Sequence, residues 1–184
     1  MISAIQSRLR LWRARHVGAG VRVVGKIWTR GRGTLVIGDR VVFDGHDYPI
    51  DLYVAPGARL VIGDDVVIRG GSSISSTHCV TIGDGARIEP FCTIMDTNWH
   101  PLRFDGGGRD SRILAASVPV VIGDRGVLGR KVIVRSGVSV GADTTVLERS
   151  VVARPLPANV TVQGYPPRPV RPKSESLRAE VVAL

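Results

Sequence analysis

The chain has 184 residues, a net charge of +9 and a sequence pI of about 10.7; 43% of its residues are hydrophobic and only 5% are aromatic. This length suits one domain that buries its core without disulfide staples, and no apolar run approaches the length of a transmembrane helix. With few aromatic rings and 22 glycines, the core must be built from Val, Ile and Leu in β structure with tight turns.

Arginine carries most of the positive charge, and the only lysines are Lys26, Lys131 and Lys173. This balance predicts an anionic partner. The candidates are nucleic acid, an acidic membrane face, a nucleotide-like cofactor and an acidic carrier protein. Nucleic acid is disfavoured because the three tryptophans, at positions 12, 28 and 99, are scattered along the chain and do not suggest a basic groove with stacking groups.

The two cysteines, Cys79 and Cys92, stand in no metal-ligand spacing, and we expect both to be small buried hydrophobes in a reducing compartment. Residues 1–16 contain arginines too early for the apolar region of a signal peptide. The sequence therefore predicts a cytoplasmic protein.

Residues 1–16 are predicted to form an amphipathic helix, because Ile2, Ile5, Leu9 and Trp12 follow helical spacing among arginines. One interpretation is a helix that caps the open end of the core. The alternative is a basic helix that lies on an anionic membrane, which would make the protein peripheral at the inner face of the membrane.

From Val17 onward, aliphatic residues recur every six positions, and four times the repeat is entered through the phrase Ile-Gly-Asp. Such dense internal repetition indicates the architecture before any motif does. The clearest ladders are Ile62, Ile68, Ile74 and Val80; Ile82, Ile88 and Ile94; and Ile122, Leu128, Val134, Val140, Val146 and Val152.

A period of six excludes an amphipathic helix, and it is shorter and more regular than the strand spacing of a sandwich. It predicts short strands separated by turns, with the aliphatic residue of each rung pointing inward and each rung hydrogen-bonded to those above and below. We therefore expect an all-β coil of parallel strands over residues 17–163. Residues 164–184 leave it, because 164–173 are rich in proline and 174–184 suit only a tail or a short helix.

The repeat is interrupted once, by a loop predicted at residues 95–119 that contains Asp96, Asn98, Trp99 and His100. A general base that takes a proton from a hydroxyl near neutral pH is best supplied by imidazole, whose unperturbed pKa is about 6.5. His100 is therefore the strongest catalytic candidate, and the alternative is a structural loop histidine held by backbone hydrogen bonds.

The six-residue repeat, the phrase Ile-Gly-Asp and the ending VTVQGYPPRPVR resemble the hexapeptide-repeat acyltransferases over residues 17–172. The loop sequence DTNWHP is similar to the Asp-x-x-x-His-Pro loop of family members that acetylate sugars. This resemblance implies a left-handed parallel β-helix that works as a homotrimer with active sites between subunits. It also implies that acetyl-CoA donates an acyl group to a hydroxyl of a sugar or polysaccharide precursor.

Carried over to this chain, the resemblance makes His100 the base that deprotonates the acceptor. Asp96 would either orient the imidazole or shape the loop, and Asn98 would contact the acceptor or the imidazole. Trp99 would stack on a sugar or wedge the loop onto the coil, and Arg109 would meet an anionic acceptor or lie at a loop tip. His78, about one coil earlier, either assists His100 or is a half-buried rung residue.

The donor site implied by the resemblance lies in the second half of the chain. Gly141, Ala142 and Ser150 would line the pantetheine groove, and Gly164 and Pro166 would close over the nucleotide. Arg168, Arg171 and Lys173 would contact phosphate, unless they form a solvated basic tail.

The four histidines include no closely spaced pair like the zinc ligands of the related carbonic anhydrases, so we predict no metal. Two alternatives to O-acetylation stay open. One is N-acetylation of a nucleotide-linked amino sugar. The other is a non-enzymatic β-helical scaffold, favoured by Leu147, Glu148 and Arg149 where the family has small residues.

Overall fold

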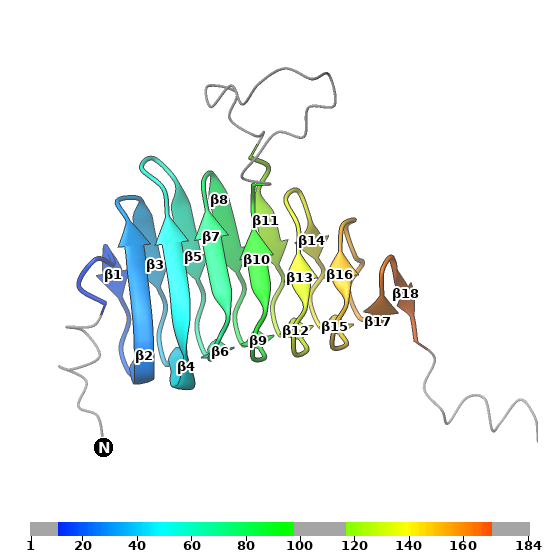
Figure 1. Cartoon of the computed structure of the whole chain (residues 1–184), viewed down its shortest axis with the longest axis horizontal. Coiled ribbons are helices and arrows are strands. Elements are labelled where there is room, and N and C mark those ends of the chain that lie inside the picture. Colours follow the sequence, from blue (N-terminus) through cyan, green and yellow to red (C-terminus); the bar gives the residue numbers. More distant parts are fainter. Residues whose placement is uncertain (1–10, 98–116, 171–184) are drawn as a thin grey trace, which may run out of the picture.

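The structure, a computed structural model, describes residues 11–97 and 117–170. These residues form a parallel β-solenoid with three flat faces and no helix, and successive coils stack along one axis (Figure 1). The predicted all-β coil of parallel strands is therefore confirmed. Within the described part of the chain, no helix is available that is long and apolar enough to cross a bilayer.

The first face is a six-stranded parallel sheet with one strand from each coil. Its register aligns the aliphatic residue of each coil with that of the next, as in Ile37, Ile62 and Ile82. In stacking order its strands are β1 (His16–Val17), β3 (Thr34–Ile37), β5 (Arg59–Ile62), β8 (Cys79–Ile82), β11 (Val120–Ile122) and β14 (Ser139–Val140).

The second and third faces are joined through two long strands, β2 (Arg22–Gly31) and β4 (Val42–Val54). The beginning of β4 pairs with β6 on the second face, and its end pairs with β7 on the third. The second face continues through β6 (Val67–Arg69), β9 (Arg87–Ile88), β12 (Val127–Leu128), β15 (Thr145–Val146), β17 (Thr161–Gly164) and β18 (Pro167–Pro169). The third continues through β7 (Ser73–Ser76), β10 (Thr93–Met95), β13 (Ile133–Val134) and β16 (Val151–Val152).

The core is a column of aliphatic side chains down the centre of the coil. Every member of the three sequence ladders is buried, and Phe43 supplies the one buried aromatic ring among the described residues. Each rung can bury its inward residue only against the rungs above and below, which is why the six-residue period translates directly into core positions.

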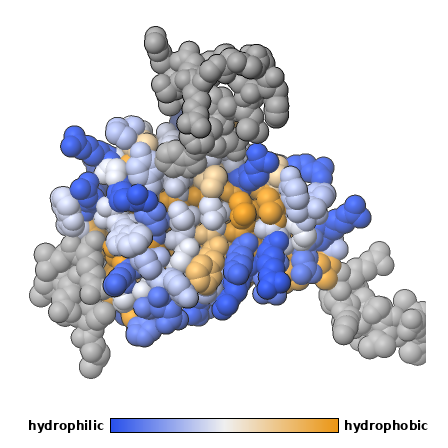
Figure 2. Space-filling view, in the orientation of Figure 1, coloured by the Kyte–Doolittle hydropathy of each residue, from blue (hydrophilic) through white to orange (hydrophobic). Residues whose placement is uncertain are grey.

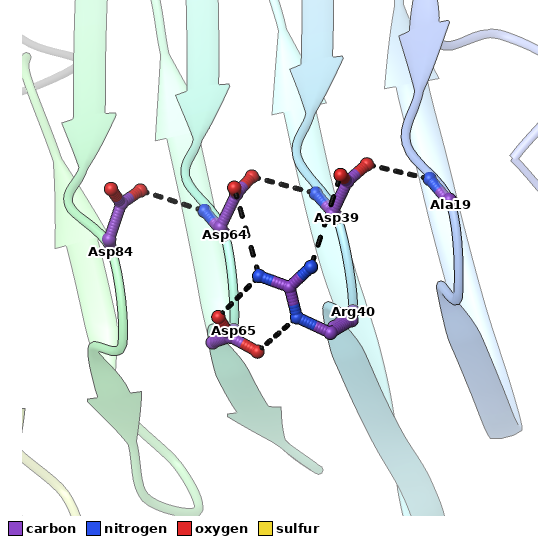
Figure 3. A network of polar contacts seen from close by, with 6 residues as sticks. All are labelled: Ala19, Asp39, Arg40, Asp64, Asp65 and Asp84. Carbon is purple, nitrogen blue, oxygen red and sulfur yellow. Dashed lines mark hydrogen bonds and ion pairs between the residues drawn. The ribbon is translucent and has the colours of Figure 1, made fainter.

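A ladder of carboxylates runs along the corner between the first and second faces (Figure 3). The Asp of each Ile-Gly-Asp phrase accepts a hydrogen bond from a backbone N–H one coil earlier: Ala19 to Asp39 (2.7 Å), Asp39 to Asp64 (2.8 Å), Asp64 to Asp84 (2.8 Å) and Asp84 to Asp124 (3.0 Å). The glycine before each Asp is required because a Cβ at Gly38 or Gly63 would overlap the carboxylate arriving from the next coil.

Coils differ in length, as the register of the first face shows. Residues Val17, Ile37, Ile62, Ile82, Ile122 and Val140 align, so successive steps are 20, 25, 20, 40 and 18 residues. The 25-residue step contains a bulge in β4, where Gly45 and Ile50 face Gly25 and Ile27. The 40-residue step contains the predicted loop.

The predicted helix over residues 1–16 is wrong for its described part. Residues 11–13 form a turn, and β1 begins at His16. Leu11 is buried in the core, and the Arg15 N–H donates to the Leu35 carbonyl oxygen at 2.8 Å, so the chain joins the solenoid from Arg15 onward. Residues 1–10 and the predicted tail from 171 onward lie outside the described residues.

Candidate functional site

The single long interruption of the solenoid has a closed stem. The chain leaves the third face after β10 and rejoins the first face at β11, and the backbone N–H of Val118 donates to the carbonyl oxygen of Asp96 at 2.9 Å. The outgoing and returning chains therefore meet at the base of the loop. We call Asp96, Ser117 and Val118, together with their partners Thr77 and Ser136, the loop stem.

Asp96 is the centre of the loop stem and is fully buried. One carboxylate oxygen accepts from the backbone N–H of Thr77 at 2.8 Å and from its hydroxyl at 2.9 Å. The other accepts from the backbone N–H of His78 at 2.8 Å and from the hydroxyl of Ser76 at 3.2 Å. A buried carboxylate is tolerated because these donors replace its hydration.

Hydroxyl groups complete the loop stem on both sides of the interruption. The hydroxyls of Thr77 and Ser117 lie 2.7 Å apart, and the Ser136 hydroxyl donates to the Asp96 carbonyl oxygen at 2.7 Å. Three successive coils are thus tied to one another at the point where the loop begins and ends. This polar network fixes where residues 98–116 enter and leave the coil, although those residues lie outside the described part.

His78 is the described histidine at the loop stem, and it is exposed. Asp96 fixes the backbone of His78, and Asp96 stands four residues before His100 in the sequence. The prediction that Asp96 orients the imidazole of His100 stays a prediction, as do the roles of Asn98, Trp99, His100 and Arg109, because those four residues lie outside the described part.

Part of the predicted donor site lies at the C-terminal end of the coil. The Ser150 hydroxyl is buried, donates to the carbonyl oxygen of Leu147 at 2.7 Å and accepts from the N–H of Gly164 at 2.9 Å. Gly164 adopts a left-handed φ of 99°, and the chain then reverses, so that β17 and β18 form an antiparallel hairpin. Pro166 lies in the hairpin turn, Arg168 is exposed on β18, and Arg171 and Lys173 lie outside the described residues.

Gly141 and Ala142 are at a different corner of the same end. They follow β14 of the first face, where the Gly141 N–H donates to the Leu156 carbonyl oxygen at 2.9 Å and the Asn159 N–H donates to that of Ala142 at 2.9 Å. Ser150 lies between β15 on the second face and β16 on the third. Within one chain, Ser150 and Gly164 are in contact through a hydrogen bond. Gly141 and Ala142 lie at another corner and do not join them.

The described residues contain no group of three or more His, Cys, Asp or Glu side chains that could hold a metal ion. Cys92 is buried, as predicted, and burial raises the pKa of its thiol to about 12. Cys79 is only half-buried. Neither cysteine belongs to the loop stem.

Sequence reasoning missed the hydroxyl partners of the loop stem. Thr77 and Ser136 come shortly after the rungs Ile74 and Val134, where the repeat pattern treats such positions as interchangeable small residues, and Ser117 lies at the end of the loop. One sequence feature points to them: hydroxyl residues, Thr97 and Ser117, stand on both edges of the long gap in the repeat.

Comparisons with known proteins identify the family and the fold of the chain. No family model matches the chain. The chain is 29% identical over 123 residues to the galactoside O-acetyltransferase of Escherichia coli strain K12, an alignment that covers 65% of the chain and 57% of that relative. It is 32% identical over 133 residues to WcaF of the same strain, a protein named as an acetyltransferase of colanic acid biosynthesis, which covers 62% of the chain and 70% of the relative.

Two solved structures share the fold. A variant of AntD, an N-acyltransferase from Bacillus cereus in complex with dTDP-4-amino-4,6-dideoxyglucose and coenzyme A, has a TM-score of 0.73 at 18% identity, covering 97% of this chain and 96% of that one. A hexapeptide-repeat acetyltransferase from Vibrio cholerae complexed with acetyl coenzyme A has a TM-score of 0.63 at 23% identity, covering 93% and 78%. At these identities the likeness establishes the fold alone.

The fold is a hexapeptide-repeat solenoid. It has a repeated six-residue rung, three faces built from parallel strands, and one long loop. The chain belongs to the hexapeptide-repeat acyltransferases, a family with O-acetylating and N-acylating members. This membership supports the left-handed coil expected from the resemblance. The match spans less than two thirds of the galactoside O-acetyltransferase.

Proposed function

We propose that the protein transfers an acetyl or other short acyl group from acetyl-CoA to a hydroxyl of a sugar or polysaccharide precursor, on the cytoplasmic side of the membrane. The observation that carries the proposal is the loop stem. The buried carboxylate of Asp96 fixes the outgoing end of one long loop, and the Asp96 carbonyl oxygen accepts from the N–H of Val118 at the returning end. In the sequence, that loop contains the histidine of the DTNWHP motif.

In this proposal His100 is the general base. It takes the proton of the acceptor hydroxyl, the acceptor oxygen attacks the thioester carbonyl, and the carbon–sulfur bond breaks to release CoA, which recovers a proton as the free thiol. Asp96 is a positioning residue, because its oxygens already accept four hydrogen bonds from residues 76–78. Asn98, Trp99 and Arg109 are proposed to contact the acceptor.

The donor would be bound at the C-terminal end of the coil. Arg168, Arg171 and Lys173 would contact its phosphates, and Gly164 and Pro166 would lie along its nucleotide. Gly141 and Ala142 are proposed to flank the pantetheine arm, with Ser150 holding Gly164 in place through their hydrogen bond.

The separation of these donor residues supports a homotrimer. Gly141 and Ala142 occupy one corner of the solenoid, whereas Ser150 and the β17–β18 hairpin lie at others, so a single groove lined by both sets needs two subunits. Val118, Val121 and Ile133 are exposed apolar side chains near the loop stem. Figure 2 shows hydrophobic surface gathered over the C-terminal half of the face in view, which suits a contact with another subunit.

N-acylation is the second candidate function. The structural likeness to AntD, an N-acyltransferase crystallised with an amino sugar nucleotide, favours it. Matched hydroxy and amino acceptors in a thiol-release assay separate the two reactions, because only the acceptor atom differs.

A transfer assay with His100→Ala tests the proposed base. We expect turnover to fall by about 10²–10⁴-fold, the usual contribution of a positioned general base. His46→Ala is the matched control, since His46 is exposed on the β4 bulge and belongs to no proposed site. Near-normal turnover in His100→Ala would remove His100 from the mechanism.

Thermal unfolding with acetyl-CoA, CoA and CoA lacking its 3′-phosphate tests the donor independently of the acceptor. A ligand at a hundredfold excess over its Kd stabilises the native state by about 2.7 kcal/mol. We expect a raised midpoint that shrinks without the 3′-phosphate. No shift with any of the three would favour the scaffold alternative or a carrier-protein donor.

A further inference from the structure

The first coil of the solenoid carries an unusual excess of positive charge. Residues 1–38 contain eight arginines and lysines and no aspartate or glutamate; the first acidic residue is Asp39. The six of these cations that the structure describes are all exposed: Arg13, Arg15, Arg22, Lys26, Arg30 and Arg32. We call these six cations, with Trp12 and Trp28, the basic end.

Few of these cations are neutralised within the described residues. Arg30 forms an ion pair with Asp51. Arg13 lies over the Trp12 ring, 4.6 Å from its centroid, and donates to the Gly31 carbonyl oxygen at 3.0 Å. The other four cations have no ion pair with a described acidic residue, so the first coil keeps an excess of positive charge. The next coil, residues 39–65, has the opposite balance, with six aspartates and two arginines.

Two tryptophans stand among the cations in exposed positions. Trp12 is 71% exposed and Trp28 is 54% exposed, although indole rings of this size are usually well buried. Trp28 lies on β2, where every second residue from Arg22 to Arg30 points outward. The result is an outer edge on which cationic and apolar side chains alternate.

A pocket of about 290 Å³ opens between Trp12 and the end of the core. Its rim carries Arg13, Arg30 and Arg32, and its floor is apolar, formed by Leu35, Leu52 and Val54. A cationic rim above an apolar floor matches the chemistry of a phospholipid, whose anionic phosphate is linked through glycerol to hydrocarbon chains.

A simpler explanation covers only part of these observations. β2 is the first strand of its sheet and pairs only with β4, and cations on such an edge prevent pairing with other chains. That function requires neither exposed tryptophans nor a pocket with an apolar floor. Nucleic acid would use the cations, but would gain nothing from the floor.

We propose that the basic end docks on the surface of an anionic bilayer. The cations would meet lipid phosphates, and Trp12 and Trp28 would lie at the level of the headgroups, where amphipathic rings are favoured. Docking does not depend on the proposed transfer reaction.

The stacking order adds a consequence for the proposed reaction. On the third face β2, β4, β7 and β10 are successive neighbours, so the loop stem after β10 lies three strand spacings from the basic end. At about 4.8 Å per spacing this is roughly 14 Å. A docked enzyme would hold its loop stem near the bilayer surface, where a sugar carried by a membrane lipid lies.

Co-sedimentation with lipid vesicles tests the proposal on the full chain. We expect binding to vesicles with about 30% phosphatidylglycerol in phosphatidylcholine, little binding to pure phosphatidylcholine, and weakening as salt rises from about 0.1 M to about 0.5 M. Equal binding to neutral vesicles, or binding to duplex DNA without binding to anionic vesicles, would overturn it.

Two charge-reversal pairs locate the surface. Arg15→Glu with Arg22→Glu alters the basic end, and Arg130→Glu with Arg154→Glu alters exposed cations in the C-terminal half; each pair lowers the net charge from +9 to +5. Each cation near an anionic surface contributes about fivefold to partitioning, so the first pair should lose about 25-fold or more. The second pair should bind nearly as the parent does. Equal losses in both pairs would show that only net charge matters and would refute a docking surface.

The aromatic contribution is separable from charge. Trp28→Ala should weaken vesicle binding at unchanged charge, whereas Tyr165→Ala, which removes a ring that is 68% exposed at the opposite end, should not. Unchanged thermal midpoints confirm that each variant folds. If Trp28→Ala binds like the parent, the tryptophan part of the proposal is wrong.

Discussion

Two corners of the solenoid use aspartate to hold neighbouring coils together, in different ways. In the carboxylate ladder each Asp accepts one backbone N–H from the preceding coil and stays half exposed, with 45% of the Asp39 side chain and 47% of the Asp64 side chain accessible. At the loop stem the single residue Asp96 is fully buried and accepts four hydrogen bonds.

The difference follows from what each corner must do. A regular corner repeats, so many hydrogen bonds of modest strength act together, and no single one decides the structure. The loop stem occurs once and has to hold a long insertion against the loss of conformational entropy, so it concentrates its interactions on one buried charge. Near the ladder, the ion pair of Arg40 with Asp65 at 2.7 Å is exposed and adds little.

The largest expected effect comes from removing the anchor of the loop stem. Asp96→Ala leaves the backbone N–H groups of Thr77 and His78 without their acceptor, whereas the Ser76 hydroxyl still donates to the Arg59 carbonyl oxygen and the Thr77 hydroxyl keeps Ser117. Hydrogen bonds to a charged group contribute about 1.5–3 kcal/mol each. With these two charged hydrogen bonds lost, we expect a loss of about 3 kcal/mol in total. For a chain of this size that lowers the thermal midpoint by about 6–12 °C at fixed protein concentration.

Asp84→Ala is the matched control, since it removes one half-exposed acceptor from the ladder. It should cost only about 1 kcal/mol. Acyl transfer should fall in Asp96→Ala and persist in Asp84→Ala if the loop stem positions the catalytic loop. Equal destabilisation by the two substitutions would contradict the distinction between the corners.

A medium effect is expected from filling the space that the ladder needs. In Gly63→Ala the new methyl group occupies the position of the Asp84 carboxylate, so the hydrogen bond from the Asp64 N–H must break or the coils must separate. Overpacking of this kind costs about 1–3 kcal/mol. Urea unfolding of both single variants and of Gly63→Ala with Asp84→Ala measures the coupling.

The double variant should cost less than the sum of the two single variants, because with the carboxylate gone the methyl group has less to displace. Simple additivity would mean that the methyl group collides with the backbone of Asp84 instead, whose nitrogen would lie 3.0 Å away.

Much of the fold was predictable from sequence because the solenoid is local and periodic. An aliphatic residue every six positions determines which residues point inward, and Ile62, Ile68 and Ile74 are buried as expected. The exceptions are places where the period does not apply. Residues 11–13 form a turn although the spacing of Ile2, Ile5, Leu9 and Trp12 suggested a helix, and the β4 bulge adds residues that no rung pattern predicts.

The candidate site was predictable in position but not in detail. A gap in the repeat and a histidine motif indicated the loop, and family resemblance indicated the acyl donor. The partners of Asp96 were not predictable, because Thr77 and Ser136 lie 19 and 40 residues from it and meet it only through stacking of coils. The separation of Gly141 from Ser150 likewise follows from which corner each occupies, which a linear motif does not specify.

The smallest expected effect is a gain that extends the ladder. Ile122 and Val140 are aligned on the first face, so Ala142 occupies after β14 the position that Asp124 occupies after β11, one coil earlier. Ala142 has no carboxylate, and the ladder ends at Asp124. In Ala142→Asp the new side chain can accept from the Asp124 N–H, and Gly123 leaves the space that such a carboxylate needs, as Gly83 does for Asp124. One added hydrogen bond should stabilise the protein by about 0.5–1 kcal/mol, a rise of a few degrees in the thermal midpoint.

Ala142→Ser is the control, because its hydroxyl is too short to reach one coil back. A lower midpoint in Ala142→Asp than in Ala142→Ser would show that the ladder depends on the packing of the earlier coils and not on the Gly-Asp step alone.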